Sequence, residues 1–456
     1  MQETPRHGLR RALVRLLKAV AAFLVLVVVV NGAFYGYYSW QVGKRVAALR
    51  RAGEPVYLEE VKVPEVAEEE NAWGDYVRLF HITGDPTTPG ARAHGLGEMS
   101  ERQYEALTGY ETSDAELRKL LHEPGVRKTV AALNAASRKP QMVMPLPTRD
   151  RLLAEFGDWR SFRDCARICR SLTYAAAVEG NMSQAGELLL TNLCISGQVT
   201  QGPTVYAETV ASAMYSTALA SAEGILAVGP IPAAQSQQLQ RELQRQQSQF
   251  AKAARQSLVI QRAGEMSLYR RLQWCPGIAS DYAFGCPMFD KDAVDRLRSN
   301  LAAMPPYWLR QRMIALDLFQ RQIQLAQAPA QHLPELEALC ASADSSSIDM
   351  AVANGAFAFV LLRVPLQQMR MNQFSVALAL NDYFRERGRY PERLGELPQP
   401  LPGDVLSGEA FRYRRVGGKY LLYGVGADRR DDGGKGRKPM LADEAGDWVW
   451  ETERRR

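Results

Sequence analysis

An unbroken run of 25 uncharged residues near the amino terminus constrains this chain more than any other feature. The run extends from Ala19 to Gly43, and its opening stretch, Ala19–Val30, is apolar throughout. About 20 apolar residues in a helix cross the hydrocarbon core of a bilayer, which is about 30 Å thick. The sequence therefore predicts one transmembrane helix at residues 19–43, with the lipid bilayer as its partner.

The flanks of this span predict its orientation. Residues 1–18 carry a cluster of basic side chains: Arg6, Arg10, Arg11, Arg15 and Lys18. The far end of the span carries aromatic rings that suit a headgroup interface: Phe34, Tyr35, Tyr37, Tyr38 and Trp40. Because positive charge is retained in the cytoplasm, we expect residues 1–18 to form a cytoplasmic tail. The rest of the chain is then periplasmic, in a single-pass protein of the inner membrane.

A cleaved signal peptide is the alternative interpretation, since it also begins with basic residues and continues as an apolar run. Bulky Phe and Tyr residues follow the run here, and the small-residue sequence Asn31-Gly32-Ala33 is a poor cleavage site. Both observations favour an uncleaved signal-anchor.

The net charge of +6 is concentrated around this anchor. Residues 1–51 hold nine Lys or Arg and a single Glu, so the remainder of the chain carries a net charge of −2. A nucleic-acid-binding domain carries a basic patch on its folded part, so no nucleic acid is expected as a partner. A hydrophobic content of 46% excludes wholesale disorder.

The chain after the span divides by composition. Glu54–Glu70 contains seven acids and two prolines, which predicts a solvated acidic stalk over residues 44–70. Residues 71–365 then show helical periodicity and predict a domain of helical hairpins. The clearest stripe recurs every three or four residues and consists of Leu152, Phe156, Trp159, Phe162, Ala166, Cys169, Leu172 and Ala176. Asn181 and Gln184 predict the start of the next helix.

Two other helical stretches have distinctive faces. Residues 232–262 predict one helix with an apolar stripe, and eight of the sixteen residues in Gln235–Phe250 are Gln. We interpret these Gln residues as a solvated, uncharged face, with a polar docking surface as the alternative. The apolar run Ala351–Leu362 has only twelve residues, so it predicts a buried helix and not a second span.

The six cysteines are expected in a compartment where thiols pair. Cys275 and Cys286 flank a connection that contains Gly and Pro, and we expect them to close a short disulfide loop. The other four are expected to be small buried hydrophobic residues: Cys165, Cys169, Cys194 and Cys340. No paired His or CxxC motif accompanies them, so the sequence predicts no zinc site.

The periodicity changes near the carboxy terminus, and residues 366–456 predict a small α+β module. A last helical stripe ends at Gly388, with Pro391 after it. Alternation in residues 411–414, the pair Gly417-Gly418 and the returning segment Lys419–Val425 together predict a β-hairpin. Residues 448–450 (WVW) predict a third short strand.

This module resembles a known family. The segments ALNDYFRERGRYPERLGEL, FRYR, KYLLYGVGADRRDDGG and GDW are similar, in that order, to the C-terminal half of the major pseudopilin of type II secretion. The resemblance covers about 75 of the 456 residues. The chain lacks the pseudopilin processing site and the glutamate at the start of the membrane helix. The resemblance therefore does not imply polymerisation. The whole chain is also similar to a class of uncharacterised membrane-anchored bacterial proteins with an NAW-type motif.

The resemblance implies a calcium site in the acidic loop, near Asp428, Asp431 and Asp432, with Asp443 or Asp447 as further ligands. Hard oxygen ligands suit calcium, which takes six to eight of them. The spacing is not that of an EF-hand, and Arg429 and Arg430 crowd the loop. A solvated turn is therefore the alternative interpretation.

The sequence shows no recognisable catalytic motif. The five histidines are scattered, and the sequence has no HExxH zinc-protease motif and no GxSxG nucleophile elbow. Packed helical hairpins commonly serve binding, so the leading hypothesis is a structural or interaction protein of the cell envelope with the terminal module as a docking element. An envelope hydrolase with a site in the helical domain, or an atypical secretion or pilus subunit, is the alternative.

Overall fold

The computed structural model describes residues 5–81, 96–109, 111–146, 159–272, 305–342, 348–426, 428–436 and 446–450. These residues are mainly helical, with few strands, as the sequence predicts. They form two compact units, which are described separately below. The first unit contains residues 1–61 and 262–320, and the second contains residues 62–261 and 321–456.

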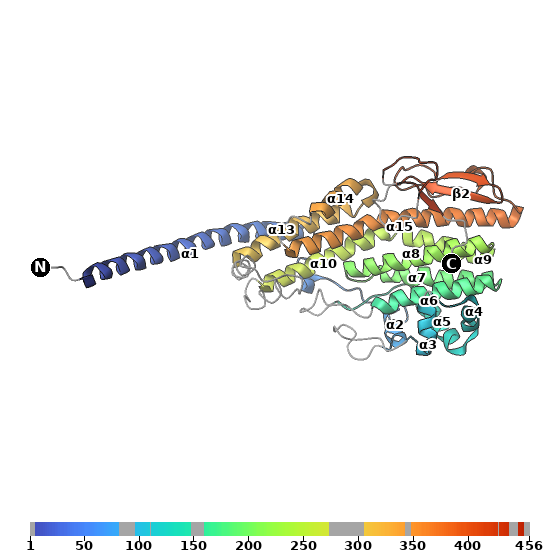
Figure 1. Cartoon of the computed structure of the whole chain (residues 1–456), viewed down its shortest axis with the longest axis horizontal. Coiled ribbons are helices and arrows are strands. Elements are labelled where there is room, and N and C mark those ends of the chain that lie inside the picture. Colours follow the sequence, from blue (N-terminus) through green and yellow to red (C-terminus); the bar gives the residue numbers. More distant parts are fainter. Residues whose placement is uncertain are drawn as a thin grey trace. The chain divides into compact units, whose positions relative to one another are not determined.

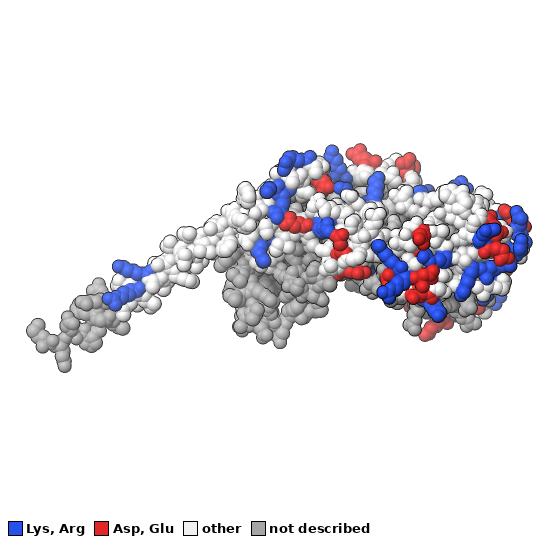
Figure 2. All heavy atoms as spheres, turned by 90° about the horizontal axis from the view of Figure 1, so that it is seen from above, with Lys and Arg blue, Asp and Glu red and all other residues white. Residues whose placement is uncertain are grey.

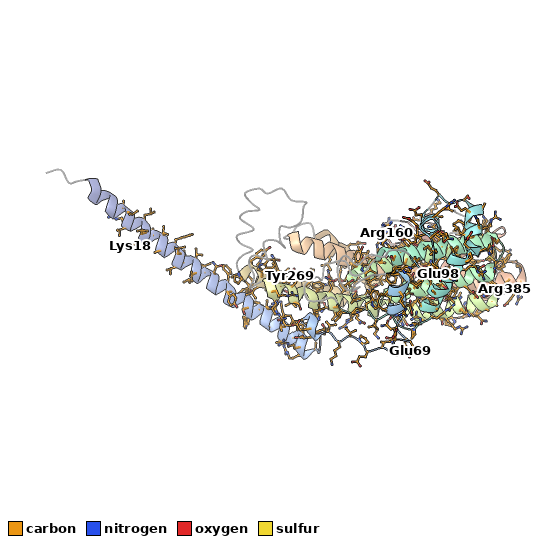
Figure 3. All side chains as sticks on the ribbon, turned by 90° about the horizontal axis from the view of Figure 1, so that it is seen from below. Lys18, Glu69, Glu98, Arg160, Tyr269 and Arg385 are labelled. Carbon is orange, nitrogen blue, oxygen red and sulfur yellow. The ribbon has the colours of Figure 1, made fainter. Side chains whose placement is uncertain are left out.

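The first unit begins with a single continuous helix, α1 (Pro5–Arg51). It is long and apolar enough to span a membrane: its best window has a mean hydropathy of 2.7, and none of that window is buried. Figure 2 shows an uncharged surface along α1 beyond the basic residues near its start, and Lys18 projects from that helix in Figure 3. The predicted span, residues 19–43, lies entirely within α1.

The residues after the span depart from the predicted stalk. Residues 44–51 continue α1, and the next stretch, residues 52–61, packs within the first unit. We call residues 52–61 the junction segment. Its Val56 and Leu58 are buried. The guanidinium groups of Arg270 and Arg312 lie 4.0 and 5.3 Å, respectively, from the centroid of the Tyr57 ring. Glu54 and Glu59 pair with Arg262 and Arg270, far along the chain, whereas residues 62–70 are largely exposed.

The second unit is built on α6 (Trp159–Val178), α7 (Met182–Val199) and α8 (Val205–Val228), which pack against one another. The described part of the predicted stripe is buried, from Trp159 to Ala176. The turn between α6 and α7 forms as predicted: Gly180 adopts a φ of 83°, and Asn181 Oδ1 accepts the Gln184 N–H at 3.1 Å. These local signals are sufficient because one apolar stripe on each helix defines the contact.

Shorter helices flank this core. On one side lie α2 (Trp73–Leu79), α3 (Glu101–Thr108), α4 (Asp114–His122) and α5 (Pro124–Ser137). The chain also forms α9 (Ala233–Gln247) and α14 (Leu333–Ser342), while α10 (Phe250–Leu272) and α13 (Pro305–Leu325) each have residues in both units.

The longest helix of this unit is α15 (Ile348–Arg387), with 40 residues. The sequence predicts two separate helices here and a domain boundary between residues 365 and 366, but α15 runs through that point without a break. Pro365 lies inside it and removes one backbone donor. Side chains on either side of it, such as Leu361 and Met369, are buried, and α15 packs against α8, α9 and α14. Figure 1 shows α15 between those helices and the sheet.

The glutamine-rich face also differs from its prediction. Residues 232–262 form two helices, and the break between α9 and α10 falls at Ser248-Gln249. Gln240 and Ser375 of α15 exchange hydrogen bonds at 2.9 and 2.7 Å, and Gln246 Nε2 donates to the Leu193 carbonyl of α7 at 2.8 Å. Gln235 and Gln247 bond to Ser183 and Asn372. Most of this polar face is therefore packed, and Gln237, Gln238 and Gln244 are the exposed members.

The small sheet forms where the sequence predicts it. Its strands are β1 (Arg412–Val416), β2 (Lys419–Gly424) and β3 (Trp448–Trp450), antiparallel in the order β1-β2-β3. Gly417 adopts a φ of 59° at the hairpin turn. The sheet packs on α15, where the Phe374 and Trp450 rings stack with centroids 5.7 Å apart.

Candidate functional site: an arginine-lined pocket

A cavity with a volume of about 820 Å³ lies in the second unit. Its walls come from α3, α4, the connection between them, α6 and α8. The basic lining residues are Arg118 of α4 and Arg167 and Arg170 of α6. We call this cavity the arginine pocket. Its volume falls within the range of about 300–1,000 Å³ that is usual for small-molecule sites.

Arg167 is held in place from behind. Its Nη1 donates to Asp164 Oδ1 at 3.1 Å, and the Asp164 side chain is only 2% exposed. The same carboxylate accepts a short hydrogen bond from the Tyr104 hydroxyl, which joins α3 to α6. Burial, followed by this bond to Asp164, raises the pKa of Tyr104 well above its ordinary value. Arg167 is thereby positioned while 40% of its side chain stays exposed.

Further hydrogen bonds fix the pocket wall. The Tyr174 hydroxyl donates to Asp114 Oδ2 at 3.2 Å, which ties α6 to the first turn of α4. Ser171 Oγ donates to the Leu107 carbonyl at 2.8 Å, and Thr112 Oγ1 donates to the Ala106 carbonyl at 2.6 Å. Ser113 caps α4 by accepting the Glu116 N–H at 3.3 Å. The wall is therefore arranged before any ligand enters.

Part of the pocket lining is apolar, and the pocket contains a gap. Leu107, Leu117, Ala220 and Ile225 line it. Gly224 of α8 also lines it, and a Cβ atom built on this glycine meets no other atom within 4 Å. The pocket thus combines basic head groups with an apolar wall that has room beside Gly224.

The charges and side-chain types in the arginine pocket indicate binding. Three arginines face two carboxylates, Glu111 and Asp114, so the formal charge of the described lining is +1. Planar guanidinium groups pair with carboxylate and phosphate through two parallel hydrogen bonds. The described lining includes neither a histidine nor a cysteine. The chemistry that these side chains favour is recognition of an anion.

A second cavity of about 420 Å³ lies between α2 and α5. Its charged side chains already form pairs: Lys139 Nζ lies 2.7 Å from Asp75 Oδ2, and Lys128 Nζ lies 2.8 Å from Glu98 Oε2. The second cavity has about half the volume of the arginine pocket.

The aspartates of the predicted calcium site have other partners. Asp431 accepts hydrogen bonds from Arg412 Nε at 2.9 Å, from the Tyr423 hydroxyl at 3.1 Å and from the Gly433 N–H at 2.9 Å. Asp428 Oδ1 accepts the Arg430 N–H at 3.1 Å. Within the described parts of the chain, no three His, Cys, Asp or Glu residues gather as metal ligands.

Asp447 occupies the interior of this loop and is fully buried. Its Oδ2 accepts the Gly434 N–H at 2.7 Å, and burial raises the pKa of its carboxyl group. The loop therefore packs over Asp447 and against β2. Gly434 contacts the side chains of Leu421 and Tyr423 on that strand. Asp432 makes no described side-chain hydrogen bond, and Asp443 lies outside the described residues.

The cysteines divide into two groups. Cys165, Cys169 and Cys194 are buried and unpaired among the described residues, as predicted, and burial raises the pKa of Cys169 and Cys194 to about 12. Such thiols are poor nucleophiles at neutral pH. Cys275 and Cys286, the predicted disulfide pair, lie outside the described residues, and so does the side chain of Cys340.

Comparison with known proteins matched this chain to no family model, no curated protein and no solved structure. The resemblance of the C-terminal module to the pseudopilin therefore rests only on the sequence segments quoted above.

Sequence reasoning missed the arginine pocket, although a signal was present. Arg163, Arg167 and Arg170 recur at steps of four and three, which places basic side chains along the polar side of α6. This spacing does not reveal that Arg118, together with the connection before α4, lines the same cavity as Arg167 and Arg170.

Proposed function

We propose that this protein is a single-pass, membrane-anchored protein of the cell envelope whose periplasmic helical body is an interaction scaffold. The observation that carries the proposal is the arginine pocket, a pre-arranged cavity lined by guanidinium groups and apolar side chains. Binding requires only such complementarity, whereas catalysis also requires a positioned nucleophile or acid–base pair.

The membrane anchor is α1. Its apolar window supports a span at residues 19–43, and the basic tail before it supports an amino terminus in the cytoplasm. Alkaline phosphatase fused after residue 456 should be active and green fluorescent protein at the same position dark. The opposite pair of results would reject the orientation.

The C-terminal module is proposed as a docking element. The resemblance of its residues to the pseudopilin supports this role, and its helix, β-hairpin and short strand form a compact unit that could present a docking surface. The resemblance favours a role as an accessory protein in the assembly of a secretion system. Filament formation is not part of the proposal, because the processing site is lacking.

Site-specific photocrosslinking in intact cells tests the scaffold function. A benzophenone amino acid replaces Ala115 at the rim of the arginine pocket, Arg414 on β1 or, as a matched exposed control, Gln238 on α9. We expect a discrete protein adduct from position 115 or position 414 and none from position 238. Adducts with secretion components at position 414 would support the accessory role. Equal, diffuse labelling at all three positions would overturn the scaffold function.

A further inference from the structure

We propose that the arginine pocket binds a small organic anion, in which a carboxylate or phosphate group is attached to an apolar body of a few carbon atoms. This inference rests on the proposed function, since it names the ligand class of the same site. Both head groups have the chemistry that a pair of guanidinium groups recognises, and the experiment below separates them.

The anionic head is assigned to the arginines. Arg167 and Arg170 lie one turn apart on α6, and Arg118 reaches the same cavity from α4. Asp164, itself held by the Tyr104 hydroxyl, positions Arg167, so its guanidinium loses little side-chain freedom when an anion binds. An anion near three guanidinium groups gains charge-assisted hydrogen bonds.

The apolar body is assigned to the apolar wall. Leu117 of α4 and Ala220 and Ile225 of α8 form that wall, and the space beside Gly224 is open. Inorganic phosphate would leave this surface in water. A ligand with a ring or a short chain would cover it and gain the free energy of apolar burial, about 25 cal/mol per Å².

The two carboxylates in the lining affect which charge a ligand can carry. Asp114 is engaged by the Tyr174 hydroxyl on α6, and Ser113 caps the helix beside it. Asp114 and Glu111 lie at the α4 end of the pocket, whereas two of the three arginines lie on α6. The three arginines of the lining outnumber its two carboxylates, so an anion is favoured over a cationic ligand of the same shape.

Ligand-observed saturation-transfer NMR on the full chain in phosphatidylcholine nanodiscs tests this inference, with empty nanodiscs as the blank. The probes are benzoate, phenyl phosphate, the neutral benzamide, the cationic benzylamine and inorganic phosphate. We expect benzoate or phenyl phosphate to bind at least about tenfold more tightly than benzamide, since a charged hydrogen-bond partner is lost in the amide. Benzylamine should not compete.

Two independent variants locate the binding. Arg170→Gln removes a guanidinium from the pocket, and Arg163→Gln removes an exposed one from the same helix. Gly224→Phe fills the open space, and Gly224→Ala is its control because a Cβ atom is accommodated there. We expect Arg170→Gln and Gly224→Phe each to weaken binding of the anionic probe about tenfold or more, with both controls unchanged.

The outcomes separate the two proposals. Equal binding of benzoate, phenyl phosphate and benzamide, or binding that Gly224→Phe leaves intact, would overturn the ligand assignment. If an adduct forms at position 115 but neither anion binds, the scaffold function stands and the anion inference fails. If an anion binds in the pocket and no position gives an adduct, the inference stands and the scaffold function fails.

Discussion

Arg262 and Glu54 form a buried ion pair between α10 and the junction segment. The Arg262 side chain is fully buried, and its Nη1 donates to Glu54 Oε2 at 2.7 Å. Its Nη2 donates to the Pro55 carbonyl at 3.1 Å. A segment whose composition favours solvation is thus tied into the first unit immediately after α1.

Arg262→Met should strongly destabilise the first unit. Breaking a buried ion pair from one side leaves the other charge without its partner, at a cost of about 3–5 kcal/mol. Arg50→Gln is the matched control, because Arg50 is 61% exposed in its pair with Glu60, and such pairs contribute about 0–1 kcal/mol. Urea unfolding of the full chain in detergent measures both. A loss no larger than that of the control would show that Arg262 is dispensable for the junction segment.

Glu208 predicts a pH dependence for the second unit. Its side chain is buried on α8, its Oε1 accepts no hydrogen bond from a described residue, and burial raises its pKa to about 8 from an ordinary value of 4.5. The folded state therefore binds more protons than the unfolded state between these two values. Stability should be unaffected below the lower value, fall as the pH rises, by at most about 1.4 kcal/mol per pH unit, and level off above the higher value.

Glu208→Gln tests this dependence. The variant has no proton to lose, so its stability relative to the wild type should increase steadily between about pH 4.5 and about pH 8. Thermal unfolding across that range measures the difference, and Glu187→Gln on the exposed face of α7 controls for the change of charge. Parallel curves for Glu208→Gln and wild type would mean that Glu208 keeps an ordinary pKa.

The local elements were predictable from the sequence because each depends on neighbouring residues. The buried stripe of α6, the Asn181 cap and the hairpin turn at Gly417 need no knowledge of distant segments. What the sequence could not show are polar contacts over long separations. Glu54 meets Arg262, and Gln240 meets Ser375, yet both acids and glutamines look solvated in a local window.

The same reasoning explains the missed pocket. The helical spacing of Arg167 and Arg170 was visible, but the cavity arises only where α4 and α8 come to lie beside α6. The continuity of α15 through Pro365 was missed because a proline normally ends a helix, whereas here the packed neighbours outweigh one lost hydrogen bond.

The packed glutamines give a stability prediction. Gln240→Ala removes two hydrogen bonds between α9 and α15 and leaves the hydroxyl and carbonyl of buried Ser375 without these partners. We expect a loss of about 1–2 kcal/mol in the free energy of unfolding. Gln238→Ala on the exposed side of α9 should change it by less than about 0.5 kcal/mol. Equal effects of the two substitutions would restore the interpretation of a solvated face.

The acidic loop offers a direct choice between a structural turn and a calcium site. The Gly433 N–H, followed by Arg412 and Tyr423, holds the pKa of Asp431 below its usual value, so the ionised carboxylate is already engaged. Asp431→Asn should therefore lower the melting temperature, because the amide loses the charge that Arg412 pairs with. Asp432→Asn is the control, since its side chain makes no described hydrogen bond, and it should leave the melting temperature unchanged. A chelator should also have no effect on the wild type. If a chelator lowers the melting temperature, and Asp432→Asn abolishes that response, the loop binds a cation and the Arg412 pairing is not what holds it.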